Sequence, residues 1–397
     1  MLSQETMDIV KSTVPVLEAH GKTITTVFYK NMLAAHPELL NVFNHANQSQ
    51  GRQQTALANT VLAAAANIDN LDAIVPAVVQ IAHKHKSLGI TEDQYPIVGY
   101  HLLGAIKEVL GDAATPEIIE AWGEAYGVIA DAFIGVEKKM YDKAEAAEGG
   151  WRMFKSFKIA NKVNESDVIT SFYFEPVDGE KLPSYLPGQY ITIRMNIPGE
   201  EYLFNRQYTL SQAPCKEGKA FRISVKREDD NTPNGKVSVH LHDNLNVGDE
   251  VEISVPAGDF HLHPESTDPV TLISGGVGVT PMMSMFEAMA QDTPEREVAF
   301  IHSARTRSHQ AFADRVNELS EAMKNTSITA LYSEEGDGFI TKELLEEKVL
   351  AGSDIYVCGP TPFMQAMISH LYALGHPEEK VHFEFFGPKA ELELVEA

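Results

Sequence analysis

Apolar side chains in the first part of the chain recur at the spacing of α-helices. The sets that follow this spacing are Val10, Val14 and Leu17; Leu57, Val61 and Ala64; Val78, Ile81, Ala82 and His85; Tyr95, Val98, Leu102 and Ile106; and Ile118, Ile119, Trp122, Ala125, Ile129 and Phe133. Breaks between helices are expected at Gly21, His36-Pro37, Gly89 and Thr115-Pro116. The pattern predicts an all-helical domain of six to eight helices over residues 1–142.

A short polar segment, residues 143–150, follows the helical pattern. It contains charged and small side chains and ends in Gly149 and Gly150. This composition is typical of a linker or a helix end, and the periodicity of the chain changes just after it. We therefore expect a domain boundary there.

From Trp151 to about Pro264 the chain alternates with period two. The alternating positions lie at 168–174, 190–195, 221–225 and 251–255, and turn signals at 178–179, 187–188 and 247–249 separate them. Short alternating strands between turns predict an antiparallel β-barrel or sandwich over residues 151–264.

The last part of the chain, residues 265–397, alternates between strand-like and helix-like segments. Strands are expected at 270–274, 297–302, 327–332, 354–358 and 381–385, with a helix at 281–291. This rhythm predicts an α/β domain with a parallel sheet and crossover helices. The acidic tail at 388–397 is expected to fray.

Composition narrows the function classes. A length of 397 residues favours two or three domains, and a net charge of -24 disfavours nucleic acids and anionic membranes as partners. Cys215 and Cys358 are the only cysteines, which fits a reducing compartment and offers no disulfide framework. The start of the chain has no secretory pattern, and no apolar run approaches the roughly 20 residues of a membrane span. We expect a cytoplasmic protein.

The expected strand at 270–274 ends in a glycine-rich loop. Gly275, Gly276 and Gly278 allow close backbone approach, and the start of the next helix favours an anion such as a phosphate. The other loop residues are Val277, Val279 and Thr280. Pro281 stands where a GxGxxG motif has its third glycine, and it suits a first helical turn. By itself the loop is equally well explained as a tight turn without a ligand.

Two further features favour a dinucleotide site. Cys358, Gly359 and Pro360 follow a later strand, at the edge where open α/β sheets bind ligands. Arg305 and Arg307 follow the strand at 297–302, where a ribose or its 2′-phosphate could be met. A solvated loop explains those arginines equally well, so the choice between NADH and NADPH stays open.

Within the barrel, Arg206, Gln207, Tyr208 and Thr209 form a strand with alternating chemistry. Arg206 and Tyr208 project to one side, where a guanidinium could grip a pyrophosphate and a phenol ring could lie along a flavin. Period two alone would also fit an ordinary barrel strand.

Six motifs occur in one order along the second half of the chain. They are Pro187-Gly188-Gln189-Tyr190, Arg206-Gln207-Tyr208-Thr209, Gly258-Asp259-Phe260, the loop at 274–281, Cys358-Gly359-Pro360 and Phe385-Phe386-Gly387-Pro388. The order resembles the ferredoxin-NADP-reductase superfamily, in which a flavin barrel precedes a nicotinamide domain. The resemblance implies that Tyr190 and residues 206–209 contact FAD, that residues 234–238 lie near its phosphates, and that the last three motifs serve the cofactors.

Six histidines of the helical domain compete as a possible metal ligand. His85 lies on an apolar face with Val78 and Ile81, and neutral imidazole is a common axial ligand of haem iron. Tyr95 and Glu137 could orient its ring and make it more electron-donating. On another wall Gln53 and Leu57 are four residues apart and could face one pocket with Phe28, Tyr29 and Phe43. Each residue taken singly is more readily structural; together they are similar to a bacterial globin.

A globin followed by a flavin barrel and a nicotinamide domain resembles the flavohaemoglobins over essentially the whole chain. The resemblance implies haem b, FAD and NAD(P)H as cofactors. By the same resemblance His85 ligates the iron, Tyr95 and Glu137 form its relay, and Tyr29 with Gln53 stabilises bound oxygen. Phe43 and Leu57 would line the haem pocket, and Lys84 and Glu384 would tune the haem and flavin potentials. The sequence departs from the family pattern at His261 and in its acidic tail.

The activity that this resemblance implies is nitric oxide dioxygenation, in which nitric oxide and oxygen become nitrate at the cost of NAD(P)H. The partners are then small molecules, and we expect a monomer with no nucleic-acid partner and no membrane insertion. Two alternatives stay open: an oxygen-binding globin or sensor whose reductase keeps the iron ferrous, and a flavin or ferric reductase.

Overall fold

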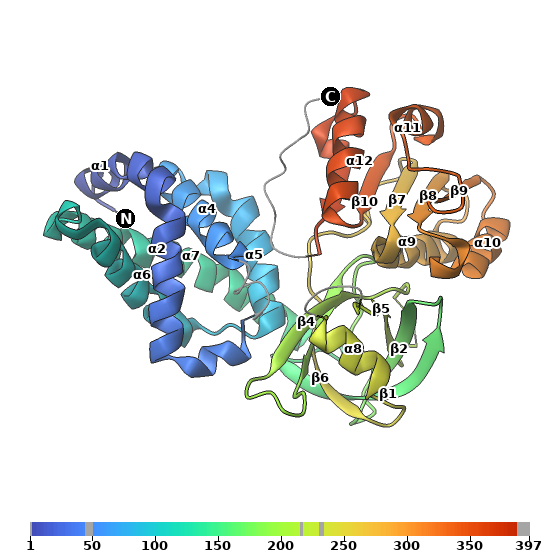
Figure 1. Cartoon of the computed structure of the whole chain (residues 1–397), viewed down its shortest axis with the longest axis horizontal. Helices are drawn as coiled ribbons and strands as arrows, with labels where there is room; N and C mark the ends of the chain where they lie inside the picture. Colours follow the sequence, from blue (N-terminus) through green and yellow to red (C-terminus); the bar gives the residue numbers. More distant parts are fainter. Residues whose placement is uncertain (1, 44–50, 215–216, 230–233, 387–397) are drawn as a thin grey trace. The chain divides into compact units, whose positions relative to one another are not determined.

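The computed structural model describes residues 2–43, 51–214, 217–229 and 234–386 (Figure 1). Its internal contacts divide the chain into two units. The first contains the residues up to Ala146 together with 151–154 and 194–205, and the second contains 147–150, 155–193 and the residues from Arg206 on.

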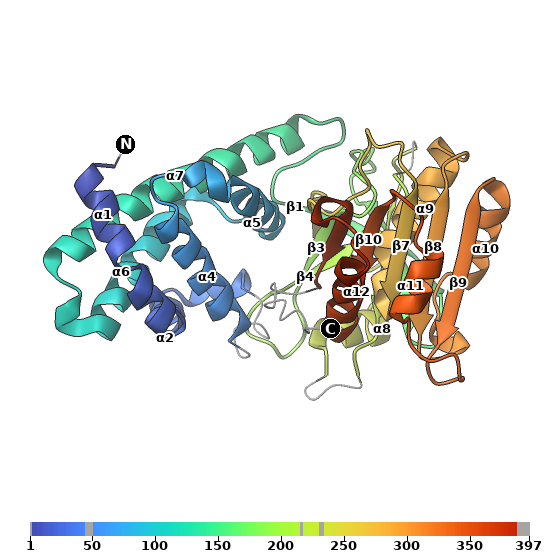
Figure 2. The ribbon, with the colours of Figure 1, turned by 90° about the horizontal axis from the view of Figure 1, so that it is seen from above.

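The first unit is built of helices, as the sequence predicts. Its α-helices are α1 (Gln4–Ser12), α2 (Val14–Ala35), α4 (Arg52–Ala66), α5 (Val75–Leu88), α6 (Tyr95–Leu110) and α7 (Pro116–Ala146), and its 3-10 turns are η1 (Pro37–Asn41), η2 (Leu71–Ile74), η3 (Glu92–Gln94) and η4 (Gly111–Ala113). The expected breaks at His36-Pro37, Gly89 and Thr115-Pro116 are confirmed. Gly89 ends α5 in the left-handed conformation, at φ 76°, which a glycine adopts without strain. The longest helix, α7, is seen along its length in Figure 2.

The expected break at Gly21 is wrong, because α2 continues through it. Gly21 is buried, and a Cβ placed on it would lie 3.4 Å from the Cβ of Ala58 on α4. The missing side chain therefore lets two helices approach. Val10 and Val14 also lie on different helices, because the chain is interrupted at Thr13, which ends α1 and accepts a hydrogen bond from Trp122 Nε1 at 3.2 Å.

The helical core forms where α2 packs on α4 and α6, and where α5 packs on α7. Its buried side chains include Ile24, Phe28, Met32, Ile106 and Trp122. Burial of one such side chain stabilises the fold by about 1.5–3 kcal/mol. The apolar periodicity of the sequence therefore corresponds to the observed core of this unit.

The antiparallel part is a six-stranded sheet in the order β4-β3-β6-β1-β2-β5. Its elements are β1 (Phe154–Asn164), β2 (Ile169–Pro176), β3 (Tyr190–Met195), β4 (Phe204–Thr209), β5 (Phe221–Lys226), the helix α8 (Lys236–Asp243) and β6 (Glu250–Ser254). The antiparallel class is confirmed, but β1 and α8 were not predicted from the sequence. Phe172 and Phe174 of β2 are buried as expected, but Ser171 between them is buried too. Its hydroxyl lies 2.7 Å from that of Ser224 on β5, so both faces of the strand are covered.

The last part is a five-stranded sheet in the order β11-β10-β7-β8-β9, with every pair parallel. Its elements are β7 (Val270–Gly275), η5 (Gly276–Gly278), α9 (Val279–Asp292), β8 (Val298–Ala304), η6 (Arg307–His309), α10 (Ala313–Ala322), β9 (Thr326–Tyr332), α11 (Lys342–Lys348), β10 (Asp354–Cys358), α12 (Thr361–Ala373), η7 (Glu378–Lys380) and β11 (Val381–Glu384). α9 and α10 cover one face, and α11 and α12 cover the other (Figure 1). The predicted α/β class is confirmed; α9 begins two residues earlier than expected, and Pro281 still lies in its first turn.

The segment expected to be a linker, 143–150, has two parts. Residues 143–146 form the end of α7, and Gly149 adopts φ 71° beyond it. Within the described residues, no helix combines the length and apolar character that crossing a membrane requires.

Candidate functional site

His85, Tyr95 and Glu137 come together from three helices of the first unit. One carboxylate oxygen, Glu137 Oε1, lies 2.7 Å from His85 Nδ1 and accepts a hydrogen bond from the Tyr95 hydroxyl at 2.6 Å. The same hydroxyl lies 3.3 Å from His85 Nδ1. Only 4% of the Glu137 side chain is exposed, so its charge acts on these two donors through little water.

The chemistry of this group determines the histidine tautomer. A carboxylate accepts hydrogen bonds only, and burial next to Glu137 raises the pKa of Tyr95 so that it stays a phenol. Nδ1–H of His85 must therefore donate the hydrogen bond to Glu137, and in the neutral ring this leaves the lone pair on Nε2. An imidazole held in this way is an oriented and electron-rich metal ligand.

Local structure positions this group. Thr91 and Gln94 form a capping box, and Tyr95 is the first residue of α6, followed by Pro96. Tyr126 of α7 donates a hydrogen bond to the backbone oxygen of Tyr95 at 2.6 Å. Its ring fits only because residue 99 is a glycine: a Cβ there would lie 2.5 Å from the ring. The close packing of α6 on α7 at Gly99 therefore also positions Tyr95 of the relay, through Tyr126.

An aromatic group forms a second part of the helical core. Tyr29 on α2 contacts the rings of Phe28 and Phe43 edge-on, at centroid distances of 4.8 and 5.7 Å. Gln53 on α4 hydrogen-bonds with the Tyr29 side chain, and burial raises the pKa of Tyr29, which keeps its hydroxyl protonated. Leu57, one turn after Gln53, packs against the same core.

These residues fit a haem. The described residues contain no group of three His, Cys, Asp or Glu that could hold a metal ion. A metal on His85 would therefore need further ligands from a prosthetic group, such as the ring nitrogens of a porphyrin. The imidazole of His85, with its lone pair on Nε2, is the axial donor that a haem iron needs, and Tyr29 adds a protonated hydroxyl among aromatic rings.

The proposed flavin residues lie on β4 and beside it. Arg206, Gln207 and Tyr208 are half-buried, and Thr209 is buried. Burial raises the pKa of Tyr208, so its ring stays neutral, while Arg206 supplies a cation to the same strand. A Cβ on Gly258, at φ 115°, would lie 3.0 Å from the ring of Tyr190, which bridges to Ala257. β4 thus offers a guanidinium and one aromatic ring, and the neighbouring β3 begins with a second ring, a set that fits a flavin dinucleotide.

The glycines of the 274–281 loop have different surroundings. Gly278 is in contact with the Cys358 carbonyl, since a Cβ would lie 2.2 Å from that oxygen, and Gly275 packs on Phe363. Gly276, at φ 54°, has open space where a Cβ would point. It precedes α9, which begins at Val279, and that opening fits a phosphate of a dinucleotide at a helix start. Gly359 and Pro360 follow β10 at the same edge of the sheet.

Arg307 does not stand alone at the end of β8. Its guanidinium pairs with Glu335 at 3.1 Å, its backbone N–H donates to the same carboxylate at 2.7 Å, and it lies 4.4 Å from the centre of the Tyr332 ring. The sequence left two interpretations of Arg307 open, a solvated loop and a phosphate contact. Neither of them included Glu335 as its partner.

The remaining predicted site residues have definite places. Lys84 precedes His85 on α5, and Glu384 ends β11, where its carbonyl accepts from Cys358 Sγ at 3.6 Å. Cys358 is buried, which raises the pKa of its thiol. Phe385 packs with Phe383, and half-exposed Phe386 follows it. Gly387, Pro388, Cys215 and the acidic tail lie outside the described residues.

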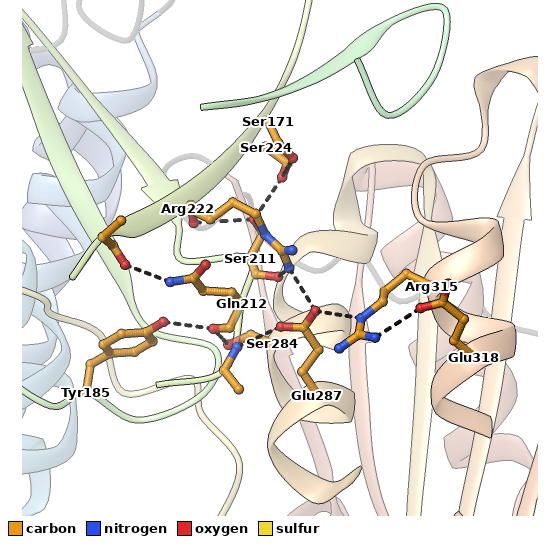
Figure 3. A network of polar contacts seen from close by, with 12 residues as sticks. Ser171, Tyr185, Ser211, Gln212, Arg222, Ser224, Ser284, Glu287, Arg315 and Glu318 are labelled. Atoms are coloured by element: carbon orange, nitrogen blue, oxygen red, sulfur yellow. Dashed lines mark hydrogen bonds and ion pairs between the residues drawn. The ribbon is translucent and has the colours of Figure 1, made fainter. Parts of the chain in front are cut away.

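One polar network was not anticipated from the sequence. Glu287 of α9 meets Arg222 of β5 and Arg315 of α10, next to the segment that follows β4 (Figure 3). The signal was present as a single glutamate in a helical run that is otherwise buried and mostly apolar, Met282–Met289. A charge in such a run implies a buried partner.

Three family models match successive parts of the chain. They are Globin over residues 26–133, the Oxidoreductase FAD-binding domain over 156–262 and the Oxidoreductase NAD-binding domain over 272–369. These ranges fall in the helical, antiparallel and parallel parts of the structure.

Curated relatives and a solved structure match nearly the whole chain. The chain is 51% identical over 406 residues to the Flavohemoprotein of Bacillus thuringiensis, covering 99% of this chain and 100% of the relative. It is 49% identical over 397 residues to Flavohemoprotein A of Dictyostelium discoideum, covering 98% of both chains. The crystal structure of flavohemoglobin from Malassezia yamatoensis with bound FAD and heme matches with a TM-score of 0.86 at 32% identity, covering 97% of this chain and 100% of that one.

Proposed function

The chain belongs to the flavohaemoglobin family, and from this premise we propose that it is a nitric oxide dioxygenase that converts nitric oxide and oxygen to nitrate. Its globin, FAD-binding and NAD-binding domains make it an NAD(P)H-dependent oxidoreductase with haem, FAD and a nicotinamide dinucleotide as cofactors. FAD held by Arg206, Tyr208 and Tyr190 would supply the conversion of hydride to single electrons, and a haem held by His85 would supply the iron chemistry with oxygen and nitric oxide.

The relay of Glu137 with His85 and Tyr95 is the observation that carries this proposal. A buried carboxylate that accepts a hydrogen bond from Nδ1–H makes the imidazole a stronger electron donor than a neutral acceptor would. Strong donation favours chemistry on oxygen over its reversible carriage. Tyr29 and Gln53 support the same assignment, because a protonated hydroxyl next to an amide can orient a small polar ligand.

The other residues have roles in the supply of electrons. Arg206, Tyr208 and Tyr190 would hold the flavin, and Gly275, Gly276 and Gly278 with residues 358–360 would hold the dinucleotide. We place the globin at 1–142, the linker at 143–150, the FAD-binding barrel at 151–264 and the nicotinamide domain at 265–397. We also propose a cytoplasmic monomer without nucleic-acid partners, in line with a net charge of -24.

A stopped-flow experiment with the purified holoprotein, NADH, air and nitric oxide tests the proposal. We expect nitric oxide to be consumed, nitrate to form and NADH to be oxidised in step. The His85→Ala variant should lose this consumption and still reduce ferricyanide through its flavin. A protein that holds oxygen and oxidises little NADH when nitric oxide is added would instead be a carrier or sensor, and equal nitric oxide consumption by His85→Ala would indicate a reductase with an incidental globin.

A further inference from the structure

A buried carboxylate, that of Glu287, joins two parts of the second unit. Its side chain is 7% exposed, and it accepts from the Ala213 backbone N–H at 3.0 Å, from Arg222 Nη2 at 3.3 Å and from Arg315 Nε at 3.4 Å. Glu287 and Arg315 belong to the nicotinamide domain, whereas Ala213 and Arg222 belong to the barrel. Figure 3 shows the carboxylate between the two guanidinium groups.

On the barrel side, the partners of Glu287 continue directly from the proposed flavin strand. β4 ends at Thr209, and Ser211 follows two residues later. Arg222 Nε donates to Ser211 Oγ at 3.1 Å, and the hydroxyls of Ser211 and Ser224 lie 2.7 Å apart. The segment that leaves β4 is therefore fixed to the interior of the barrel.

On the other side, α9 continues directly from the dinucleotide loop and contacts the same segment. Ser284 Oγ donates to the Gln212 carbonyl at 2.7 Å, and that oxygen also accepts from the Tyr185 hydroxyl at 2.9 Å. Met285 packs so closely on Gly188 that a Cβ there would lie 2.7 Å from its Cε. Contacts of Ser284, Met285 and Glu287 thus fix α9 to the barrel.

This arrangement is not explained by stability alone. A buried ion pair loses so much hydration that apolar replacements are often neutral or stabilising. An open cavity of about 640 Å³ lies beside the pair, lined by Gln212, Glu217, Arg222, Glu287, Gln291 and Arg315, among others. Its two arginines are matched by two glutamates, so the lining does not select an anion. The buried charges are better explained by their directional contacts, which hold α9 and the barrel in one geometry.

We propose that Glu287 is a positioning residue for hydride transfer, holding the dinucleotide loop in register with the flavin strand through α9. The inference rests on the NAD(P)H-to-FAD part of the proposed function and not on its nitric oxide chemistry. Hydride transfer needs its two reacting groups in near-attack geometry, and a misplacement of about 1 Å can cost on the order of 100-fold in rate. Loosening α9 therefore lowers the rate of transfer more than it weakens the binding of the dinucleotide.

The test uses the full-length holoprotein and the isosteric variant Glu287→Gln. Amide hydrogen exchange should accelerate at Ala213 and along α9. In anaerobic stopped-flow experiments with NADH, the limiting rate of flavin reduction should fall about tenfold while the NADH dissociation constant changes less than about twofold. Glu318→Gln is the matched control, because it removes only the exposed partner that Arg315 Nη1 contacts at 3.0 Å, and it should leave all three quantities unchanged.

Ser284→Ala provides a second variant without a buried charge change, for the case in which Glu287→Gln does not fold. We expect a smaller loss of the limiting rate, about threefold, with faster exchange in the 210–213 segment. An unchanged limiting rate despite faster exchange overturns the proposal, and so does a rise in the dissociation constant alone or an equal loss in Glu318→Gln. Since these measurements need neither oxygen nor nitric oxide, normal flavin reduction without nitrate formation would contradict only the proposed function.

Discussion

At the scale of single residues, Glu137 accepts two hydrogen bonds, one from His85 Nδ1 and one from the Tyr95 hydroxyl. Glu137→Gln removes the charge and leaves an amide of the same shape, so Nδ1 of His85 loses its anionic acceptor. With a less electron-rich imidazole, we expect the haem reduction potential to rise and nitric oxide turnover to fall about 10–100-fold. A potentiometric titration, monitored by the Soret band of the haem, measures the change in reduction potential.

The matched control for Glu137→Gln is Tyr95→Phe. It removes one of the two hydrogen bonds to the carboxylate and leaves the bond from His85 in place. Its potential should shift in the same direction by a smaller amount. Equal potentials in Glu137→Gln and the parent protein would show that the carboxylate does not tune the iron.

Tyr29 allows a second prediction at this scale. Tyr29→Phe keeps the ring contacts with Phe28 and Phe43 and removes only the hydroxyl that Gln53 meets. Loss of one donor to a charged ligand is worth about 1.5–3 kcal/mol, so oxygen release should accelerate at least tenfold. Flash photolysis of the ferrous protein measures this rate, and a rate within twofold of the parent would exclude Tyr29 as the donor.

Whether the sequence could identify a site residue depended on how far along the chain its partners lie. Chemical type suggested that Tyr95 and Glu137 could orient His85, and the family resemblance named them as its relay. Only the structure shows that both His85 and Tyr95 meet one oxygen of Glu137. Glu287 had a local signal, a charge in a buried run, but its partners Ala213 and Arg222 come from another part of the chain. No periodicity specifies such a contact, because it depends on the tertiary packing.

At the scale of elements, two glycines of α6 give opposite predictions. Gly99→Ala places a Cβ 2.5 Å from the Tyr126 ring, whereas a Cβ at Gly104 meets nothing within 4 Å. Gly99→Ala should therefore destabilise the helical unit by about 1–3 kcal/mol through overpacking, and Gly104→Ala should stabilise it by up to about 1 kcal/mol through helix propensity. Urea unfolding followed by far-ultraviolet circular dichroism measures both. The same sign for the two variants would contradict the observed contact.

Element boundaries were predicted where they depend on local chemistry. Gly89 and Pro116 end or begin helices as the sequence indicated, because one adopts a positive φ and the other lacks an N–H. Gly21 misled for the reason that explains Gly99: a glycine can serve close helix packing instead of a turn. The central parallel strands β7, β8 and β10 were found since both of their faces are buried and read as nearly continuous apolar runs. α8 was missed because five of its eight residues are polar, and its three apolar residues, Val237, Val239 and Leu241, alternate with them as in a strand.

At the scale of the whole molecule, the order of three domain types followed from changes of period along the chain, at about residues 143–150 and 265. This worked because each class buries its side chains with a different repeat. The cofactor sites were predicted from the order of the motifs along the chain, not from the period of its hydrophobic pattern.

The last prediction concerns the pH dependence of the second unit. His302 of β8 is buried beside Ser274 of β7, with its Nδ1 2.8 Å from Ser274 Oγ, and burial lowers its pKa from 6.5 to about 4. Burial also lowers the pKa of His242, His261 and His382 in the same unit. Between pH 6.5 and 4 the unfolded chain therefore binds protons that the folded unit does not, so the free energy of unfolding falls as the pH falls.

For His302 alone the loss reaches about 3 kcal/mol at pH 4 and is absent above pH 7, on the order of 1.4 kcal/mol for each unit of pKa. Urea unfolding followed by flavin release at several pH values measures the slope. His302→Asn, which cannot take up the proton, should flatten the curve between pH 6.5 and 4 at some cost in stability at neutral pH. A parallel curve for the variant would mean that His302 charges while folded, and the acid sensitivity would then belong to other titratable groups of the unit.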